Sequence, residues 1–260
     1  MFKIASNNNK SVGVKSIKRV ALILKCLNNG INSITDIANA CNLSKSTVHR
    51  LLKALEDASF VFQDLNNKEY YLGHLVAELT TNPRATHEYL IKCAERDMHR
   101  LNEETGETVS LGVLLGHAYH SLLSLPSKNE LRVIEERKTF TDINLGASGK
   151  ILLSQLDSQG LKEALNYLFS GSKDKIILSE KRKIIAQIRG IRKKGYAISY
   201  GERIPGVICL SAPVSGYLYP VSISLFGPDS RIRSKIYSLL NGLTDCATRI
   251  SKILHAQPLK

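Results

Sequence analysis

The 260-residue sequence predicts an α+β protein in which a winged helix-turn-helix domain is joined by a linker helix to a C-terminal α/β domain built on an antiparallel sheet. Three observations predict this fold. Residues 33–59 hold two short amphipathic helices separated by a tight turn. Residues 60–73 hold a short pair of strands. Beyond residue 105, strand patterns are mixed with amphipathic helices.

Composition excludes several classes of protein. With 43% hydrophobic residues the chain is globular rather than disordered, and 260 residues are enough for two domains. No run of about 18 apolar residues is present, so no membrane span is expected, and no signal peptide is visible. The five cysteines are scattered and include no CxxC pair, so neither a zinc site nor a disulfide framework is predicted. These features fit a cytoplasmic protein.

The net charge of +13 favours a polyanionic partner. Residues 1–80 hold ten Lys/Arg against six Asp/Glu, a net charge of +4. Residues 81–260 hold 26 Lys/Arg against 17 Asp/Glu, a net charge of +9. The basic character is therefore not confined to the N-terminal part of the chain.

The first domain is expected at residues 14–73, after a polar, flexible arm at 1–13. Its first helix begins near Ser16 and carries apolar side chains on one stripe as far as Leu27. The sequence Asn28-Asn29-Gly30 ends this helix, because glycine readily adopts the left-handed backbone found after a helix C-terminus.

The next two helices have the spacing of a helix-turn-helix. Ser33 is placed to cap the first of them, and Asp36 stands three residues later, at the acidic position of a capping box. Asn42 provides the turn, because asparagine tolerates a left-handed backbone. Two helices that cross steeply also need a small residue and an apolar plug, which Ala38 and Val48 supply.

The second of these helices follows Ser44, its expected N-cap, and carries a polar face opposite an apolar one. In a helix-turn-helix this polar face enters the DNA major groove, and the start of the helix can also hold phosphates. An ordinary helical hairpin with a solvated basic face would show the same pattern. The residues predicted to contact DNA are Lys45, Ser46, Thr47, His49, Arg50 and Lys53.

A small hairpin directly after these helices is typical of a wing. Residues 60–62 and 70–72 have strand propensity, and residues 64–68 form the turn between them. Lys68, in this turn, is the candidate contact of the wing with phosphate or the minor groove. A linker helix is expected at 74–84, with an interruption near Pro83, because proline cannot continue a helix without losing a hydrogen bond.

The second domain, at residues 85–260, mixes strands and helices in a pattern that predicts one antiparallel sheet with helices packed on it. Helices are expected at about 85–105, 147–156, 161–169, 179–194 and 229–255. Strands are expected at 108–115 and 118–125, near 131–136, and at 196–200, 207–213 and 219–226.

Three stretches carry a family pattern: ITDIANACNLSKSTVHRLLKALEDASFV in the first domain, LNEETGETVSLGV at 101–113, and GYAISYGERIPGVICLSAPV at 195–214. Through these motifs the chain resembles the IclR family of transcriptional regulators over nearly its whole length. The resemblance implies a DNA-binding regulator that works as a homodimer or dimer of dimers on double-stranded DNA. Repression is the expected direction of control, and activation is the alternative. The resemblance also implies that the C-terminal domain, of GAF/profilin-like type, binds a small organic acid or a similar metabolite.

The same resemblance implies an effector pocket at one end of the sheet. Phe226 stands at a pocket position that is often serine in the family, and TFTDINLGAS replaces the usual proline-containing run before the helix at 147. A degenerate pocket is therefore the alternative. Matched residue by residue, the pocket positions are Ala147, Ser148, Ser199, Cys209, Ser224 and Phe226.

The residue pattern adds one more candidate to this site. Ser222, Ser224 and Phe226 share one face of a strand, because side chains alternate along it. Serines that face inward need hydrogen-bond partners, which a polar ligand or ordered water would supply. Bonds to the backbone, or a place at the rim of the domain, would satisfy them equally well.

The motifs of enzymes are incomplete in this chain. The sequence NLGASGKI at 144–151 lacks the first glycine and the final Ser/Thr of a phosphate-binding loop. His117 and His120 are expected on opposite sides of a strand, which predicts no metal site, and no GxSxG elbow is present. No catalytic residue, metal or cofactor is predicted. The leading hypothesis is an effector-responsive transcription factor, ahead of a DNA-binding dimer with a non-sensing C-terminal domain and of an enzyme with an appended DNA-binding domain.

Overall fold

The computed structural model describes residues 15–134, 141–142, 146–169 and 175–256. They form two compact units that divide between Asn82 and Pro83, and each unit has its own apolar core. The arm predicted at residues 1–13 lies outside the described residues. None of the described helices is both long enough and apolar enough to cross a membrane.

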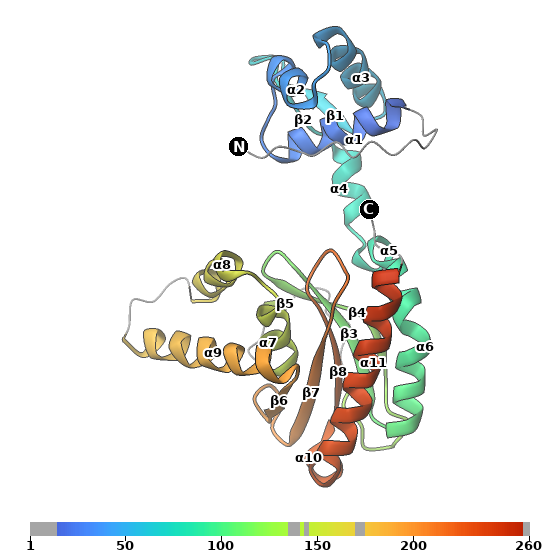
Figure 1. Ribbon diagram of the computed structural model, residues 1–260, viewed down its shortest axis with the longest axis vertical. Helices are drawn as coiled ribbons and strands as arrows, with labels where there is room; N and C mark the ends of the chain where they lie inside the picture. The colour runs from blue at the N-terminus through green and yellow to red at the C-terminus, as the bar shows by residue number, and fades with distance from the viewer. Residues whose placement is uncertain (1–14, 135–140, 143–145, 170–174, 257–260) are drawn as a thin grey trace. The chain divides into compact units, whose positions relative to one another are not determined.

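The N-terminal unit consists of three packed helices, a two-stranded wing and a following helix (Figure 1). Side chains from all three packed helices and from both strands meet in its core, including Ile23, Ile37, Leu52 and Tyr70. The predicted winged helix-turn-helix is confirmed. Its elements are α1 (Lys15–Asn28), α2 (Ile34–Cys41), α3 (Lys45–Asp57), β1 (Val61–Gln63), β2 (Tyr70–Leu72) and α4 (His74–Thr80).

Short-range hydrogen bonds set the two helices of the motif. The Ser33 hydroxyl accepts from the Asp36 backbone N–H at 3.1 Å and donates to the Asp36 carboxylate at 2.6 Å. Asn42 ends α2 in the left-handed conformation, with φ of 52°. The Ser44 hydroxyl accepts from the Thr47 backbone N–H at 3.2 Å and caps α3. Both predicted caps and the predicted turn are confirmed.

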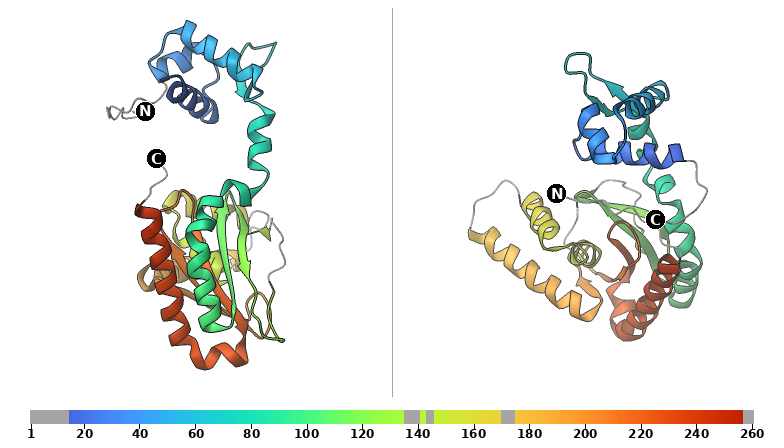
Figure 2. Two further views of the ribbon diagram at one scale, coloured as in Figure 1. Left: turned by 90° about the vertical axis from the view of Figure 1, so that its right-hand side faces the viewer. Right: turned by 45° about the horizontal axis from the view of Figure 1, so that its top comes forward.

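The C-terminal unit is built on one antiparallel sheet with the strand order β5-β4-β3-β8-β7-β6. On one face, α6 (Glu88–Thr105) and α11 (Ile236–Ala256) lie side by side (Figure 2). On the other face lies α7 (Ala147–Ser154), against which α8 (Ser158–Leu168) and α9 (Lys175–Lys194) pack. The strands are β3 (Thr108–Leu115), β4 (Ala118–Leu125), β5 (Thr141–Asp142), β6 (Ala197–Tyr200), β7 (Val207–Val214) and β8 (Val221–Pro228).

The two faces of this sheet differ in polarity. The face toward α6 and α11 is aliphatic, with Val109, Leu111 and Ile223 among its fully buried side chains. The face toward α7 carries hydroxyl groups on the same central strands, because each strand alternates aliphatic and polar residues. These buried polar residues are Thr108, Ser110, Ser211, Ser222 and Ser224. A face of this kind needs hydrogen-bond partners, which makes it the place to look for a site.

Three predicted elements are wrong in part. Residues 131–134 of the strand predicted near 131–136 form no strand, and 135–136 lie outside the described residues. The helix predicted from 85 begins at Pro83 instead, as α5 (Pro83–Thr86), since proline suits the first position of a helix, and a break at His87 separates α5 from α6. The single closing helix predicted at 229–255 consists of α10 (Asp229–Ile232), a 3-10 turn (Arg233–Lys235) and α11.

At the break, the buried His87 ring packs edge-on against the rings of Tyr217 and Tyr219. The His87 residue is 2% exposed, and its Nδ1 atom lies 2.7 Å from the Tyr217 hydroxyl. His120 on β4 is 4% exposed. Burial lowers the pKa of both imidazoles, and the nearby charge of His120 lowers the pKa of His87 further. Both side chains are therefore held in the neutral form at neutral pH.

We expect the C-terminal domain to lose stability as the pH falls below about 6.5, the pKa of an unperturbed histidine. A histidine whose pKa is lower in the folded state contributes its full stability above the unfolded pKa. That contribution is lost as the pH falls toward the folded pKa, because the unfolded chain then binds more protons. The slope reaches at most about 1.4 kcal/mol per pH unit for each histidine. Urea unfolding between pH 7.5 and 5.5 measures this slope of stability against pH. If a variant with both His87→Gln and His120→Gln kept the same slope, the pH dependence could not be assigned to these two histidines.

Candidate functional site

Hydrogen bonds divide the polar face of α3 into two groups of residues. The Ser46 and Thr47 hydroxyls lie 3.0 and 2.8 Å from the Ser44 hydroxyl, so both belong to the helix cap. The Lys53 ammonium lies 2.6 Å from the Glu56 carboxylate, and this hydrogen bond raises the pKa of Lys53. Three of the six α3 side chains predicted to contact DNA, those of Ser46, Thr47 and Lys53, thus already have polar partners inside the domain.

Lys45, His49 and Arg50 form the second group. All three are exposed, and none has a hydrogen bond or ion pair with its side chain within the described residues. Their spacing places them on one face of α3, in its N-terminal half. This half of the recognition helix is the part that usually meets base edges in helix-turn-helix complexes. These three residues are therefore the best-placed DNA contacts of the helix.

The wing presents Lys68 from a fixed turn. Its backbone has φ of 60°, and its N–H donates to the Asp64 carbonyl at 2.9 Å. The Gln63 side chain donates to the Lys68 carbonyl at 3.0 Å. Asp64 and Glu69 flank this lysine, so the turn is not basic as a whole. Lys68 is positioned for a single phosphate contact rather than as part of a basic patch.

In the C-terminal domain, a cavity lies between the start of α7 and the polar face of the sheet. The centre of a water molecule can move through about 60 Å³ of it, which is room for a few waters or one compact ligand. Six of the seven residues assigned to this site from the sequence line it: Ala147, Ser148, Ser199, Cys209, Ser224 and Phe226.

Ser222, the seventh, does not line the cavity. It shares the α7-facing side of β8 with Ser224, but it lies opposite Gly112 and Pro213, one pair of residues farther along the strand. Its hydroxyl is buried and makes no hydrogen bond within the described residues. Alternation along the strand predicts its face correctly, but it does not predict where along the strand the cavity opens.

A row of hydroxyl groups crosses three strands beneath the cavity. Ser110, Ser224 and Ser211 are register partners on β3, β8 and β7. The Ser224 and Ser211 hydroxyls are 2.9 Å apart, and the Ser110 hydroxyl is 3.3 Å from the Tyr119 hydroxyl. The Tyr119 ring covers Gly112 so closely that a Cβ atom there would lie 2.2 Å from the ring. The floor is therefore polar and already ordered before a ligand adds contacts to it.

Several cavity residues come from segments that carry no periodic sequence signal. Arg203 and Ile204 belong to the connection between β6 and β7, and Arg203 has the only charged side chain among the described residues that line the cavity. The GER motif at 201–203 was the available signal, although its Glu202 binds the Lys150 ammonium of α7 at 2.8 Å. The remaining lining residues outside the predicted set are Tyr119, Val133, Ile134, Gly146 and Val207.

The start of α7 adds to the positive character of the cavity. Gly146 occupies the N-cap position and has no side chain of its own with which to cap this end of the helix. Backbone N–H groups in the first turn of a helix carry a partial positive charge and bind anions. These N–H groups suit a negatively charged ligand.

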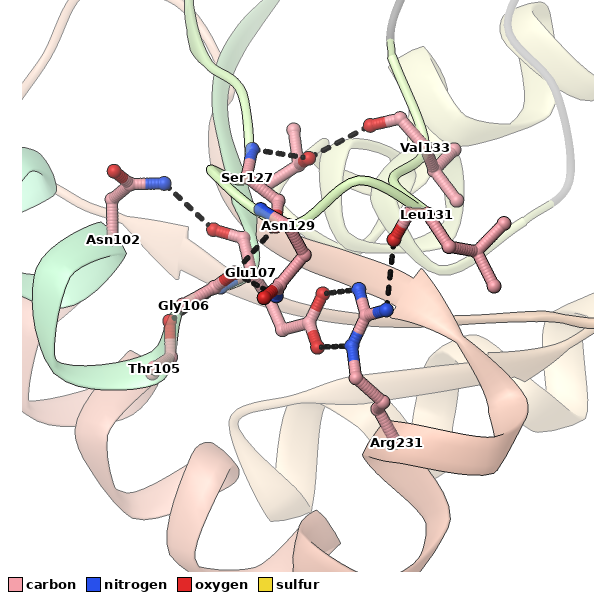
Figure 3. A network of polar contacts seen from close by, with 10 residues as sticks. Asn102, Thr105, Gly106, Glu107, Ser127, Asn129, Leu131, Val133 and Arg231 are labelled. Atoms are coloured by element: carbon pink, nitrogen blue, oxygen red, sulfur yellow. Dashed lines mark hydrogen bonds and ion pairs between the residues drawn. The ribbon is translucent and has the colours of Figure 1, made fainter.

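A polar network holds the wall that Val133 contributes (Figure 3). The Glu107 side chain is 6% exposed and accepts two hydrogen bonds from Arg231, at 2.6 and 2.7 Å. Arg231 also donates to the Leu131 carbonyl at 2.8 Å, and the Thr108 hydroxyl donates to the Val133 carbonyl at 2.7 Å. These contacts fix an irregular segment against the sheet.

The two units together define a class of protein: a transcriptional regulator with a winged helix-turn-helix domain for DNA binding and a separate α/β domain with an antiparallel sheet. The chain belongs to the IclR family. Residues 84–252 match the family described as bacterial transcriptional regulator IclR C-terminal, and residues 16–65 match the IclR helix-turn-helix domain. The family predicted from the sequence is confirmed.

Full-length relatives support this assignment. The chain is 26% identical over 246 residues to the HTH-type transcriptional regulator BhcR of Paracoccus denitrificans, covering 93% of this chain and 88% of that protein. It is 26% identical over 251 residues to the HTH-type transcriptional repressor AllR of Salmonella paratyphi A, covering 95% and 92%. The fold is similar to an IclR homologue of Microbacterium hydrocarbonoxydans complexed with 4-hydroxybenzoate, with a TM-score of 0.57, 18% identity and coverage of 93% and 100%.

Proposed function

We propose that this protein is a cytoplasmic, homodimeric repressor whose affinity for its operator changes when a small organic anion occupies the cavity beside α7. The observation that carries the proposal is the convergence of six predicted pocket residues, Arg203 and the α7 N-terminus on one cavity. A related structure holds 4-hydroxybenzoate, and a relative is named a repressor. Phe226 narrows the cavity, which favours a compact or flat ligand.

Ser224→Leu is expected to abolish the response to the ligand while leaving DNA binding by the ligand-free protein intact. The added side chain would fill the cavity, whereas the DNA-binding surface lies in a separate unit with its own core. A regulatory ligand typically changes DNA affinity about 5- to 150-fold. The measurement is a titration of operator DNA, selected from random sequence, with and without the ligand.

The ligand is first sought by thermal shift with small carboxylic acids, beginning with 4-hydroxybenzoate, because a ligand of the folded state raises the melting temperature. Ser222→Leu is the matched control, since it adds the same bulk on the same face of β8 outside the cavity. Arg203→Gln removes the cavity's charge without adding bulk and should weaken binding. A full response in both cavity variants would place the ligand elsewhere. If no acid shifts the melting temperature, the non-sensing regulator replaces this proposal.

The dimer is proposed to form through α1 and α4. No residue of α4 is buried, although a seven-residue helix is unstable without packing. Leu79 on α4 is 60% exposed and Ile17 on α1 is 68% exposed. One recognition helix also reads too few base pairs to select a single genomic site.

Sedimentation at micromolar concentration should therefore show a species of about twice 28.8 kDa. An Ile17→Glu, Leu79→Glu variant should shift toward the monomer, since burying the new charges at an interface is unfavourable. Leu218→Glu, at a position 75% exposed in the other unit, serves as the control. A wild-type protein that stays monomeric and binds one chain per DNA site would contradict the dimer.

A further inference from the structure

Most of the net charge of the C-terminal domain is on one helix. Residues 81–260 hold 26 Lys/Arg against 17 Asp/Glu, a net charge of +9. Of these, α9 holds eight Lys/Arg and one Asp/Glu, a net charge of +7. The rest of the domain is therefore close to neutral. The basic character that the N-terminal domain does not explain is concentrated on α9.

Within the described residues the cations of α9 have no acidic partners, whereas several cations elsewhere in the domain do. Arg100, Arg231 and Arg233 each bind a carboxylate. Within the described residues, α9 makes no ion pair, and Lys181 and Arg192 bond to neutral oxygen atoms. Five further cations of α9 are exposed and have no polar side-chain partner in the described part of the chain: Arg182, Lys183, Arg189, Lys193 and Lys194.

The side of α9 toward α8 continues this cationic surface. The two helices, which lie next to each other in Figure 2, border a groove lined by Lys162, Lys181, Arg189 and Arg192. None of the described residues that line it is acidic. Leu161, Leu165, Ile185 and Ile188 also line the groove, so it combines cations with apolar side chains and offers a partner no negative charge.

The chemistry of this surface indicates which partner it fits. Between Ser179 and Lys194, the part of α9 whose side chains are described, there is no exposed large hydrophobic side chain. A protein interface has an apolar core, and a helix that lies on a membrane has an exposed apolar face. A nucleic-acid backbone requires only cations, and duplex DNA carries one charge per roughly 1.7 Å. Residues 181–194 hold seven cations over about 20 Å of helix, a density of the same order.

We propose that α9 is a second DNA-binding element that holds phosphates of the duplex without reading bases. The inference rests on DNA binding by the N-terminal domain and is independent of the effector proposal. Each phosphate neutralised by α9 releases condensed counterions, so α9 should raise affinity for duplex DNA of any sequence and steepen its dependence on salt.

The test measures the affinity of the full-length protein for a duplex of arbitrary sequence, about 60 base pairs long, between roughly 50 and 200 mM salt. The α9 variant carries four substitutions: Arg182→Gln, Lys183→Gln, Arg189→Gln and Lys193→Gln. The slope of log affinity against log salt should fall by about two to four, and affinity near 0.1 M salt should fall about tenfold or more. The control removes the same charge elsewhere in the domain, at exposed cations that have no acidic partner within the described residues: Arg96→Gln, Lys128→Gln, Lys235→Gln and Lys252→Gln.

The control set should change the slope by less than about one. Equal losses in both sets would show a general charge effect and overturn the inference, as would an α9 variant that binds like wild type.

A polyglutamate peptide, titrated in parallel, tests for an acidic protein partner instead. If binding of this peptide depends on α9 while DNA binding does not, α9 is assigned to an acidic protein partner. An Arg50→Ala variant separates the two DNA surfaces, since it should relax operator selectivity with little effect on the slope. Wild-type protein that binds no duplex would contradict DNA binding by the N-terminal domain, and this inference with it.

Discussion

Replacing Arg231 by methionine is expected to lower the free energy of unfolding of the C-terminal domain by about 3–5 kcal/mol. The Glu107 carboxylate is buried and receives two hydrogen bonds from this guanidinium. Without the guanidinium, the buried Glu107 carboxylate has no positively charged partner. Methionine is chosen because it retains most of the aliphatic length of arginine, so the loss reports mainly on the missing charge. Gly227 contributes to the tight fit, because a Cβ atom there would lie 2.3 Å from the carboxylate. Urea denaturation of the full-length protein at pH 7.5 measures the loss.

Arg233→Met is the matched control, two residues away in the same turn. Arg233 pairs with Asp229, but both side chains are substantially exposed and screened by solvent, so the loss should be much smaller than for Arg231→Met. Equal, small losses in the two variants would show that the Glu107 pair does not stabilise the domain. Arg231→Met should also weaken ligand binding, because the Leu131 carbonyl loses its donor and only the Thr108 bond to the Val133 carbonyl still holds the wall at Val133 and Ile134.

Arg50→Ala is expected to weaken operator binding by about 1–3 kcal/mol for each recognition helix. Arg50 is exposed in the N-terminal half of α3, and its guanidinium has no partner within the described residues, so binding DNA breaks no existing contact. If Arg50 pairs with guanine, selection of DNA by the variant should show one relaxed base position per half-site. Fluorescence anisotropy with operator and single-base variants measures both effects.

Lys53→Ala provides the comparison for this measurement. Its ammonium is bound to Glu56, so the contact with phosphate must replace an existing ion pair, and the net loss should be smaller. A loss that is uniform over all sequences would make Arg50 a phosphate contact. No loss for Arg50→Ala, Lys45→Ala or His49→Ala would remove this face of α3 from the interface.

The helix-turn-helix was predictable because its determinants are local. Ser33 and Asp36, and Ser44 and Thr47, bond across three residues, and Asn42 needs only its own backbone preference. Residue types at fixed offsets therefore contain the whole signal. The sequence could not predict which polar side chains of α3 are bound within the domain and which are left for DNA, because the Lys53–Glu56 pair is one of several ion pairs that the helix spacing would allow.

The strand predicted near 131–136 shows where sequence patterns stop being sufficient. Leu131 and Val133 have the alternation of a strand, but their carbonyl groups accept hydrogen bonds from the side chains of Arg231 and Thr108 rather than from a neighbouring strand. These partners are 100 and 25 residues away in the sequence. For the same reason the sequence did not predict the cavity residues Val133, Ile134 and Arg203, which lie in irregular segments. It did predict cavity residues on regular strands and at the start of α7.

The central proposal is that ligand binding and DNA binding are coupled in this protein. Its most direct test is the affinity of the ligand, measured by calorimetry with the protein free and with the protein saturated by operator DNA. Coupling requires the two ligand affinities to differ by the same factor by which the ligand changes operator affinity, about 5- to 150-fold. Identical ligand affinities in the two titrations would contradict the proposal, however tightly the ligand binds.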